Sequence, residues 1–196
     1  VAALAREIEQ KIISTQAIEL YPKRWPNLAK GKKHYEESCA QCHGQTGKGD
    51  GPSGNGLDPK PADFHADRAK EMSPFQFYNS IRLGVPGTAM ASFSNFSDSD
   101  TWNLAFYVSS LKYGVNPNSN TSTLTLKELA SQTDVALQAK GQAVGLSRTY
   151  QVSESEELQS LDFARTQLVL AFSEYKNNDK RKAKDAAVAA YLEGVE

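Results

Sequence analysis

The chain has 196 residues, with 22 lysines and arginines against 23 aspartates and glutamates, which gives a formal net charge of −1. This balance excludes the broad basic surface that a general nucleic-acid binder needs. No run of the sequence approaches the ~20 apolar residues of a membrane-spanning helix.

Residues 1–20 are predicted to begin with an amphipathic helix, because Leu4, Ile8, Ile12 and Ile13 recur at helical spacing with charged residues between them. Two prolines shortly after residue 20 end this helix. A second helix is expected from about residue 27 to residue 42.

Residues 44–72 are expected to form a loop, because six glycines and three prolines fall between positions 44 and 61. A helix follows from Ser73 to Leu83, since Ser73 fits the cap and the proline after it fits the first helical position. Ser97 caps a further helix, which is expected to stop at Gly114.

The rest of the chain, after Gly114, is also predicted to be mainly helical. Residues 115–125 form a polar linker, and residues 126–143 form a helix. Ser153 and Glu156 make a capping box that opens a long helix. A turn at residues 177–179 and a last helix over residues 180–192 complete an αα-hairpin.

Cys39-Ala40-Gln41-Cys42-His43 is a C-x-x-C-H motif, the attachment signature of c-type haem. Two thiols at this spacing can each form a thioether to a haem vinyl group, and the adjacent His43 can ligate the iron. A zinc site needs about four ligands, and the chain has no other cysteine. A thioredoxin-like cysteine pair needs a β-strand before its helix, whereas the segment before Cys39 is predicted to be helical. The sequence therefore predicts one covalently attached haem c with His43 as proximal ligand.

The candidates for the sixth iron ligand are Met72, Met90, His34 and His65. Met90 is favoured because it lies in a loop between two helices, from which a side chain can reach the opposite face of the haem. Met72 directly precedes a helix cap and fits a packing role. His34 lies on the proximal helix, and His65 fits a surface position near the haem edge.

The second ring nitrogen of His43 is expected to donate a hydrogen bond to a backbone carbonyl, as in most histidine-ligated metal sites. Three prolines of the following loop, Pro52, Pro59 and Pro61, are candidates for this acceptor. Pro61 is favoured among them.

Residues 27–113 resemble a class I c-type cytochrome domain. The matching stretches are Gly31-Lys32-x-x-Tyr35, Cys39-x-x-Cys42-His43-Gly44, Gly47-x-Gly49-Asp50-Gly51-Pro52, Leu57-x-Pro59-x-Pro61-x-Asp63-Phe64 and Gly84-x-Pro86-Gly87-Thr88-x-Met90. The resemblance implies a helical haem domain in which the segment with Gly31 and Tyr35 crosses a C-terminal helix at close range.

Residues 164–196 resemble the extracytoplasmic segment of bacterial high-affinity iron permeases. That segment ends in a Tyr-Leu-x-Gly-Phe-Glu-like motif, for which this chain has Tyr191-Leu192-Glu193-Gly194-Val195-Glu196. Some members carry a cytochrome c domain inserted in this helical region. The resemblance implies a fusion protein whose permease membrane domain is absent from this chain.

The elements and resemblances together predict an all-α chain in four parts. Residues 1–20 are the N-terminal helix of a helical domain, 21–114 the class I cytochrome c haem domain, 115–125 a linker, and 126–196 the C-terminal helical domain. Residues 1–20 and 126–196 are expected to pack together as one unit, because the apolar stripe of the first helix needs a partner.

The expected function is one-electron transfer by a single haem, coupled to iron uptake by the fused permease. Ferrous or ferric iron, or a redox protein, is the expected partner. A haem closed by His43 and Met90 has no open position for a substrate, which favours a carrier over an enzyme. The one enzymatic reaction that would fit such a haem is the oxidation of ferrous iron. The alternatives are a free periplasmic cytochrome c and an electron-transfer subunit of a dehydrogenase or oxidase.

A third alternative is an acidic helical iron-binding module with an accessory haem. Carboxylates are hard oxygen ligands that suit iron. The candidates are Glu174, Asp179, Asp185, Glu193 and Glu196.

Haem c is assembled outside the cytoplasm, so the chain is expected at the periplasmic or extracytoplasmic face of a membrane. The first residues carry neither an initiator methionine nor a basic signal region. We therefore expect an export signal that is absent from this chain.

Overall fold

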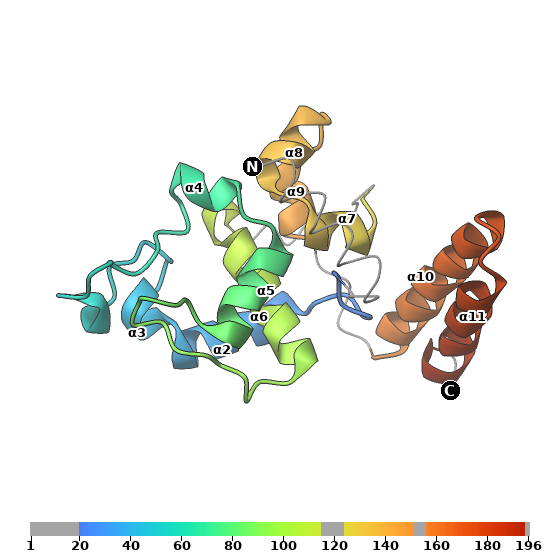
Figure 1. Cartoon of the computed structure of the whole chain (residues 1–196), viewed down its shortest axis with the longest axis horizontal. Coiled ribbons are helices and arrows are strands. Elements are labelled where there is room, and N and C mark those ends of the chain that lie inside the picture. The colour runs from blue at the N-terminus through green and yellow to red at the C-terminus, as the bar shows by residue number, and fades with distance from the viewer. Residues whose placement is uncertain (1–19, 115–123, 151–155, 195–196) are drawn as a thin grey trace.

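A computed structural model describes residues 20–114, 124–150 and 156–194 of the chain (Figure 1). Every regular element within these ranges is a helix, which confirms the all-α prediction. None of the described helices is both long and apolar enough to cross a membrane. The predicted N-terminal helix, most of the linker and Ser153 of the predicted capping box lie outside the described residues.

The predicted haem domain is built on α2 (Leu28–Ser38), α5 (Pro74–Leu83) and α6 (Asp98–Ser110). Their starts follow from side-chain caps: Asn27 accepts from an N–H in the first turn of α2, and Ser73 and Ser97 do the same for α5 and α6. The predicted helix over 27–42 is divided at Cys39, after which α3 (Ala40–His43) begins.

The predicted loop between residues 44 and 72 contains two short helical turns, η1 (Pro52–Gly54) and α4 (Asp67–Lys70). A third turn, η2 (Leu111–Tyr113), extends α6 to Gly114, where the helix was expected to stop. None of these turns exceeds four residues, so the segment keeps the irregular path that its glycines and prolines predict.

Helices α2 and α6 cross at Gly31. A Cβ atom at this position would collide with the backbone carbonyl of Asn103 and with the side chain of Tyr107. The fully buried ring of Tyr35, one turn further along α2, lies 5.5 Å from the ring of Tyr107. The close crossing expected from the class I cytochrome resemblance is therefore present, and the missing side chain of glycine makes it sterically feasible.

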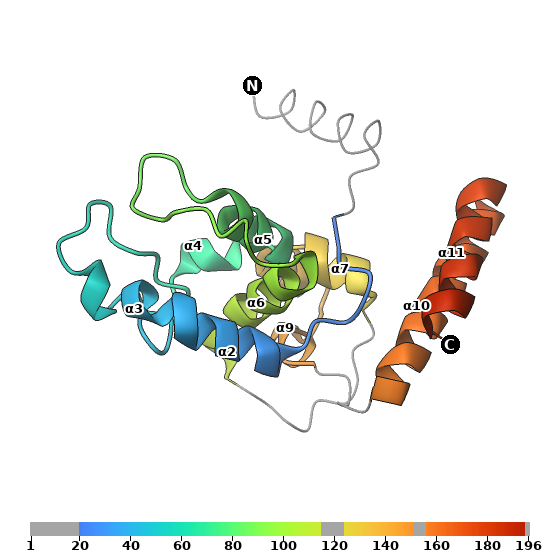
Figure 2. The same ribbon diagram turned by 90° about the horizontal axis from the view of Figure 1, so that it is seen from below.

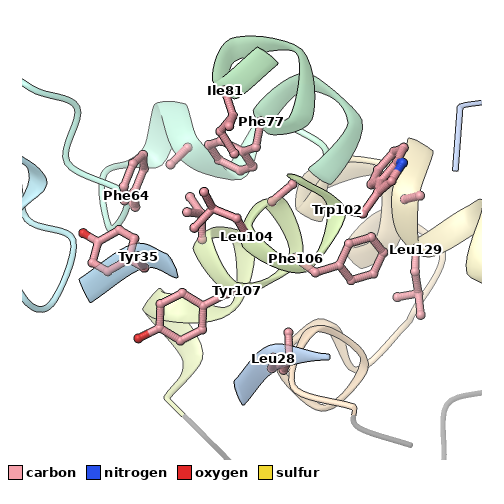
Figure 3. Close-up of a cluster of buried hydrophobic side chains, with 14 of the residues drawn as sticks. Leu28, Tyr35, Phe64, Phe77, Ile81, Trp102, Leu104, Phe106, Tyr107 and Leu129 are labelled. Atoms are coloured by element: carbon pink, nitrogen blue, oxygen red, sulfur yellow. The ribbon is translucent and has the colours of Figure 1, made fainter. Parts of the chain in front are cut away.

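Helix α6 lies at the centre of the core, and its residues 101–110 are all buried. Figure 3 shows the side chains of α6 surrounded by those of α2, α5, the loop before α4 and the segment that contains Leu129. The labelled members are Leu28, Tyr35, Phe64, Phe77, Ile81, Trp102, Leu104, Phe106, Tyr107 and Leu129. A helix whose residues are apolar or small on all sides is stable only when other elements pack against all of its sides. Elements from distant parts of the sequence therefore surround α6.

Helices α7 (Leu126–Ser131), α8 (Asp134–Ala139) and α9 (Val144–Arg148) complete this cover. Leu129 of α7 belongs to the same buried cluster as Phe106 of α6. The structure therefore differs from the predicted division, in which residues 126–196 form one domain apart from the haem domain. The predicted helix over 126–143 is also interrupted, because Gln132 is extended and Thr133 caps α8.

Asp134 lies at the centre of the contact between these helices and the haem domain. Its carboxylate accepts hydrogen bonds from Arg148 Nε at 2.8 Å and the Tyr113 hydroxyl at 2.8 Å, and lies 2.7 Å from Lys112 Nζ. Arg148 is itself fully buried and donates to two backbone carbonyls at the end of α7. One carboxylate thus joins η2, α8 and α9.

Helices α10 (Glu156–Lys176) and α11 (Lys180–Gly194) form the predicted αα-hairpin. The turn between them contains Asn178 at a positive φ of 65°, a conformation that asparagine tolerates. Phe163, Ala164, Ala183, Ala186 and Ala190 of the hairpin are buried, and the Arg24 guanidinium lies 5.4 Å from the centre of the Phe163 ring. Figures 1 and 2 both place the hairpin at the end of the molecule farthest from α3.

Candidate haem site

The C-x-x-C-H motif lies on one helical turn. The Cys39 N–H continues the hydrogen-bonding of α2 by donating to the Tyr35 carbonyl at 2.8 Å, and the His43 N–H donates to the Cys39 carbonyl at 2.9 Å. The thiols of Cys39 and Cys42 are half-buried and form no disulfide. Two accessible thiols and an imidazole are therefore held on a short rigid segment, as covalent haem attachment requires.

The surroundings of the Cys39 thiol favour its neutral form. Burial, together with the neighbouring Cys42, raises the pKa of the Cys39 thiol to about 12. The thiolate is the reactive and metal-binding form of cysteine. The unmodified Cys39 is therefore a neutral thiol at neutral pH.

The imidazole of His43 is held in one tautomer. Its Nδ1 lies 3.1 Å from the backbone carbonyl oxygen of Ala62. A carbonyl can only accept, so Nδ1 carries the hydrogen and the neutral ring keeps its lone pair on Nε2. Burial also lowers the pKa of His43, while the bond to Ala62 opposes that shift. Nε2 is thus the nitrogen available to an iron atom.

The acceptor of this hydrogen bond is Ala62 and not Pro61, so the prediction was wrong by one residue. The Pro61 carbonyl lies directly against Gly49, where a Cβ atom would collide with it. Any residue can supply a backbone carbonyl, so the sequence carried no signal that would have identified Ala62.

The glycine-rich loop packs its apolar residues against the His43 ring. Phe64 stacks on this ring with centroids 4.7 Å apart and planes at 20°, and it meets Phe77 edge-on. The Phe64 N–H donates to the Gly47 carbonyl at 2.7 Å, and the Tyr35 hydroxyl donates to the Gly44 carbonyl at 2.7 Å. Side chains and backbone together fix the orientation of the imidazole.

Met90 lies in the loop that joins α5 to α6, as predicted. The loop is closed by its own hydrogen bonds: the Val85 N–H donates to the Met90 carbonyl at 3.1 Å, and the Met90 N–H meets the Thr88 hydroxyl at 3.1 Å. Arg82 Nη1 donates to the Phe96 carbonyl at 2.6 Å at the far end of the loop. Met90 is half-buried against the core, and so is Met72.

The two other histidines engage the protein through Nε2. His34 Nε2 lies 3.1 Å from Asp100 Oδ1, and its ring packs 5.1 Å from that of Phe96. His65 Nε2 lies 2.7 Å from the Thr46 carbonyl, so this nitrogen carries the hydrogen. Met90 and Met72 are the two candidate ligands that carry sulfur, and both lie half-buried against the core.

These residues fit a c-type haem. The two thiols are half-buried and unpaired by any disulfide, Nε2 of His43 has a free lone pair, and half-buried apolar side chains border the same core. Within the described ranges, no three or more His, Cys, Asp or Glu residues are grouped as a separate metal site would require. Asp179, one of the acidic candidates, caps α11 and pairs with Lys182 at 3.1 Å.

Residues 28–112 match the family model of cytochrome c, a range that runs from the start of α2 into η2. A solved chain of the reducing HAO-like protein complex of Kuenenia stuttgartiensis is 37% identical, with a TM-score of 0.43. That match covers 48% of this chain and 49% of the other, so this chain corresponds to about half the length of that protein. No curated protein matches the chain.

Proposed function

Because residues 28–112 form a cytochrome c domain, which implies covalent haem c, we propose that this chain is a single-haem electron carrier on the extracytoplasmic side of a membrane. Cys39 and Cys42 would hold the haem as thioethers, and His43 and Met90 would ligate its iron. The haem supplies a one-electron couple, whose potential a methionine ligand raises.

The observation that carries this proposal is the tautomer of His43. Its Nδ1–H is committed to the Ala62 carbonyl at 3.1 Å, so Nε2 keeps the lone pair that an iron atom needs. The Phe64 ring supports the imidazole at 4.7 Å and restricts its rotation. A ligand whose orientation is set before iron binds needs little rearrangement between oxidation states.

The ligand pair is tested by replacing each methionine in turn. The haem-loaded protein should contain one haem per chain, and its oxidised form should show the weak far-red sulfur-to-iron absorption. Met90→Ala should abolish this band and lower the reduction potential, whereas the matched variant Met72→Ala should keep both. Retention of the band in Met90→Ala with its loss in Met72→Ala would reverse the assignment.

A second proposal is that this electron transfer serves iron uptake by a fused permease. It is supported by the resemblance of residues 164–196 to permease extracytoplasmic segments and by the Tyr191-Leu192-Glu193-Gly194 end of α11. The partners would be the permease membrane domain and ferrous or ferric iron. Ferrous iron should then reduce the oxidised protein, or a ferric complex should oxidise the reduced protein.

Iron accumulation in cells tests the coupling itself. The full-length protein should lose uptake when Cys39 and Cys42 are both replaced by Ser. Unchanged iron accumulation, with the variant still present in the membrane, would contradict the coupling to iron uptake. The chain would then be an electron carrier without a role in uptake.

A further inference from the structure

The segment that carries Met90 is folded back on the end of α5. Helix α5 ends at Leu83 and α6 begins at Asp98, so residues 84–97 form the loop between them. Gly84 has a φ of 71°, and a Cβ atom there would lie 2.7 Å from the Met90 carbonyl oxygen. Glycine alone tolerates both this conformation and this close approach. The backbone of Met90 therefore lies directly against the end of the helix.

The loop supplies hydrogen-bond partners to the last turn of α5. The last four carbonyls of a helix have no partner within the helix itself. The Phe93 N–H donates to the Ile81 carbonyl at 2.9 Å, and the Ser92 hydroxyl donates to the Arg82 carbonyl at 2.6 Å. The residues two and three positions after Met90 are thus held in place relative to α5.

The Arg82 side chain closes the base of this loop. Its Nη1 donates to the Phe96 carbonyl at 2.6 Å and lies 3.4 Å from the Ser94 carbonyl oxygen. Among the described residues, no carboxylate forms an ion pair with Arg82, so its guanidinium serves these loop carbonyls. A hydrogen bond from a charged donor is stronger than one between neutral groups.

The acceptor end of this hydrogen bond is itself anchored. The Phe96 ring stacks on that of Phe93 at 5.9 Å and lies 5.1 Å from the ring of His34 on α2. The next residue, Ser97, caps α6. The bond from Arg82 therefore joins the end of α5 to a fixed point at the start of α6, which restrains the loop between them.

We propose that Arg82 is a positioning residue for Met90. It holds residues 84–97 against α5 through the loop backbone, and so restricts the departure of Met90 from the iron. This inference rests on the proposed function, because it takes Met90 as the sixth ligand. An external ligand binds only where Met90 has left, so its apparent affinity is reduced by the fraction of molecules that are open.

Imidazole binding to the oxidised, haem-loaded protein tests the proposal. Arg82→Gln should tighten imidazole binding by about tenfold, the factor that corresponds to ~1.4 kcal/mol and is typical of one hydrogen bond from a charged group. The far-red sulfur-to-iron band should also be lost at a lower temperature in this variant. Ser80→Ala is the matched control on the same helix, because the Ser80 hydroxyl donates to the Gln76 carbonyl within α5 at 3.0 Å.

Arg82→Lys separates positioning from a simple effect of charge, and it is the milder variant if Arg82→Gln fails to fold. A lysine keeps the charge but places a single ammonium group on a shorter side chain. We expect tighter imidazole binding in Arg82→Lys than in the unaltered protein. If Arg82→Gln only lowered the reduction potential, and Arg82→Lys restored it with imidazole affinity unchanged throughout, Arg82 would act through its charge and the proposal would be wrong.

Hydrogen exchange of the loop distinguishes a failure of this inference from a failure of the ligand pair. The amides of Val85 and Phe93 donate to the Met90 and Ile81 carbonyls, and they should exchange faster in Arg82→Gln than in Ser80→Ala. Equal exchange and equal imidazole affinity in the two variants, with the far-red band present, would overturn the role of Arg82 alone. An unaltered protein without that band would contradict Met90 as ligand, and the role of Arg82 toward it would fall as well.

Discussion

At the scale of single residues, Asp134 is the group that joins helices α7–α9 to the haem domain. It faces two cationic side chains, Arg148 at 2.8 Å and Lys112 at 2.7 Å, all of them buried. Asp134→Ala would leave both charges unpaired, and we expect a loss of about 3–5 kcal/mol of unfolding free energy, the usual cost of breaking a buried ion pair. Urea unfolding of the haem-loaded protein measures this loss.

Glu36→Ala is the control for Asp134, because Glu36 forms an exposed pair with Lys32 at 3.8 Å. An exposed pair of this kind contributes ~0–1 kcal/mol. If the two variants lost the same small amount, the carboxylate of Asp134 would not be holding the segments together.

At the scale of helices, the crossing of α2 and α6 depends on Gly31. Alanine is the better helix former by about 1 kcal/mol, so local propensity alone predicts that Gly31→Ala stabilises the protein. We expect a net loss of about 1–3 kcal/mol instead, because the added Cβ atom would overlap backbone of α6 at Asn103. The unfolding midpoint should fall for Gly31→Ala and stay close to the original for the exposed Lys33→Ala on the same helix.

The start of α7 should make stability depend on pH. Glu128 accepts hydrogen bonds from the Thr125 N–H and hydroxyl, both at 2.9 Å, which hold the pKa of Glu128 below its ordinary value. Because the pKa of Glu128 is lower in the folded state, ionised Glu128 stabilises the folded protein fully above its unfolded-state pKa of about 4.3. This stabilisation is lost as pH falls through the folded-state pKa.

Glu128→Gln isolates this contribution, because glutamine can keep the capping box but does not titrate. Above pH 6 the original protein should be more stable by about 0.3–1 kcal/mol, the usual value of a carboxylate in a first helical turn. The difference should disappear toward pH 3. A difference that stays constant from pH 6 to pH 3 would show that ionised Glu128 contributes nothing at this cap.

At the scale of the whole molecule, the boundary of the haem domain can be tested by truncation. Residues up to Val144 share the buried cluster of α6, whereas Phe163 and the buried alanines of α10 and α11 lie outside this cluster. A chain of residues 20–150 should therefore retain its haem spectrum and a cooperative unfolding transition. A chain of residues 20–123 should be markedly less stable, because it exposes Phe106 and leaves Lys112 without its carboxylate partner. If the two truncated chains were equally stable, the haem domain would end near residue 114, as the sequence predicts.

The haem attachment site was largely predictable from the sequence because its chemistry is local. Cys39, Cys42 and His43 lie on one helical turn, so their spacing already determines their relative positions. The helix starts at Ser73 and Ser97 were predictable for the same reason, since a cap acts within three residues. Met90 could be placed in its loop, but its role as ligand stays a proposal.

Tertiary packing decided the features that depend on contacts between distant residues. The acceptor for His43 is Ala62, 19 positions away, and a backbone carbonyl has no sequence signature. The place of α7–α9 on the haem domain follows from Asp134 meeting Lys112 and Arg148, whose charges look like ordinary surface charges in the sequence. The sequence by itself determined the all-helical class and the covalent haem motif, because both follow from short-range geometry. Only the fold decided where the haem domain ends, because burial depends on which surfaces the whole chain brings together.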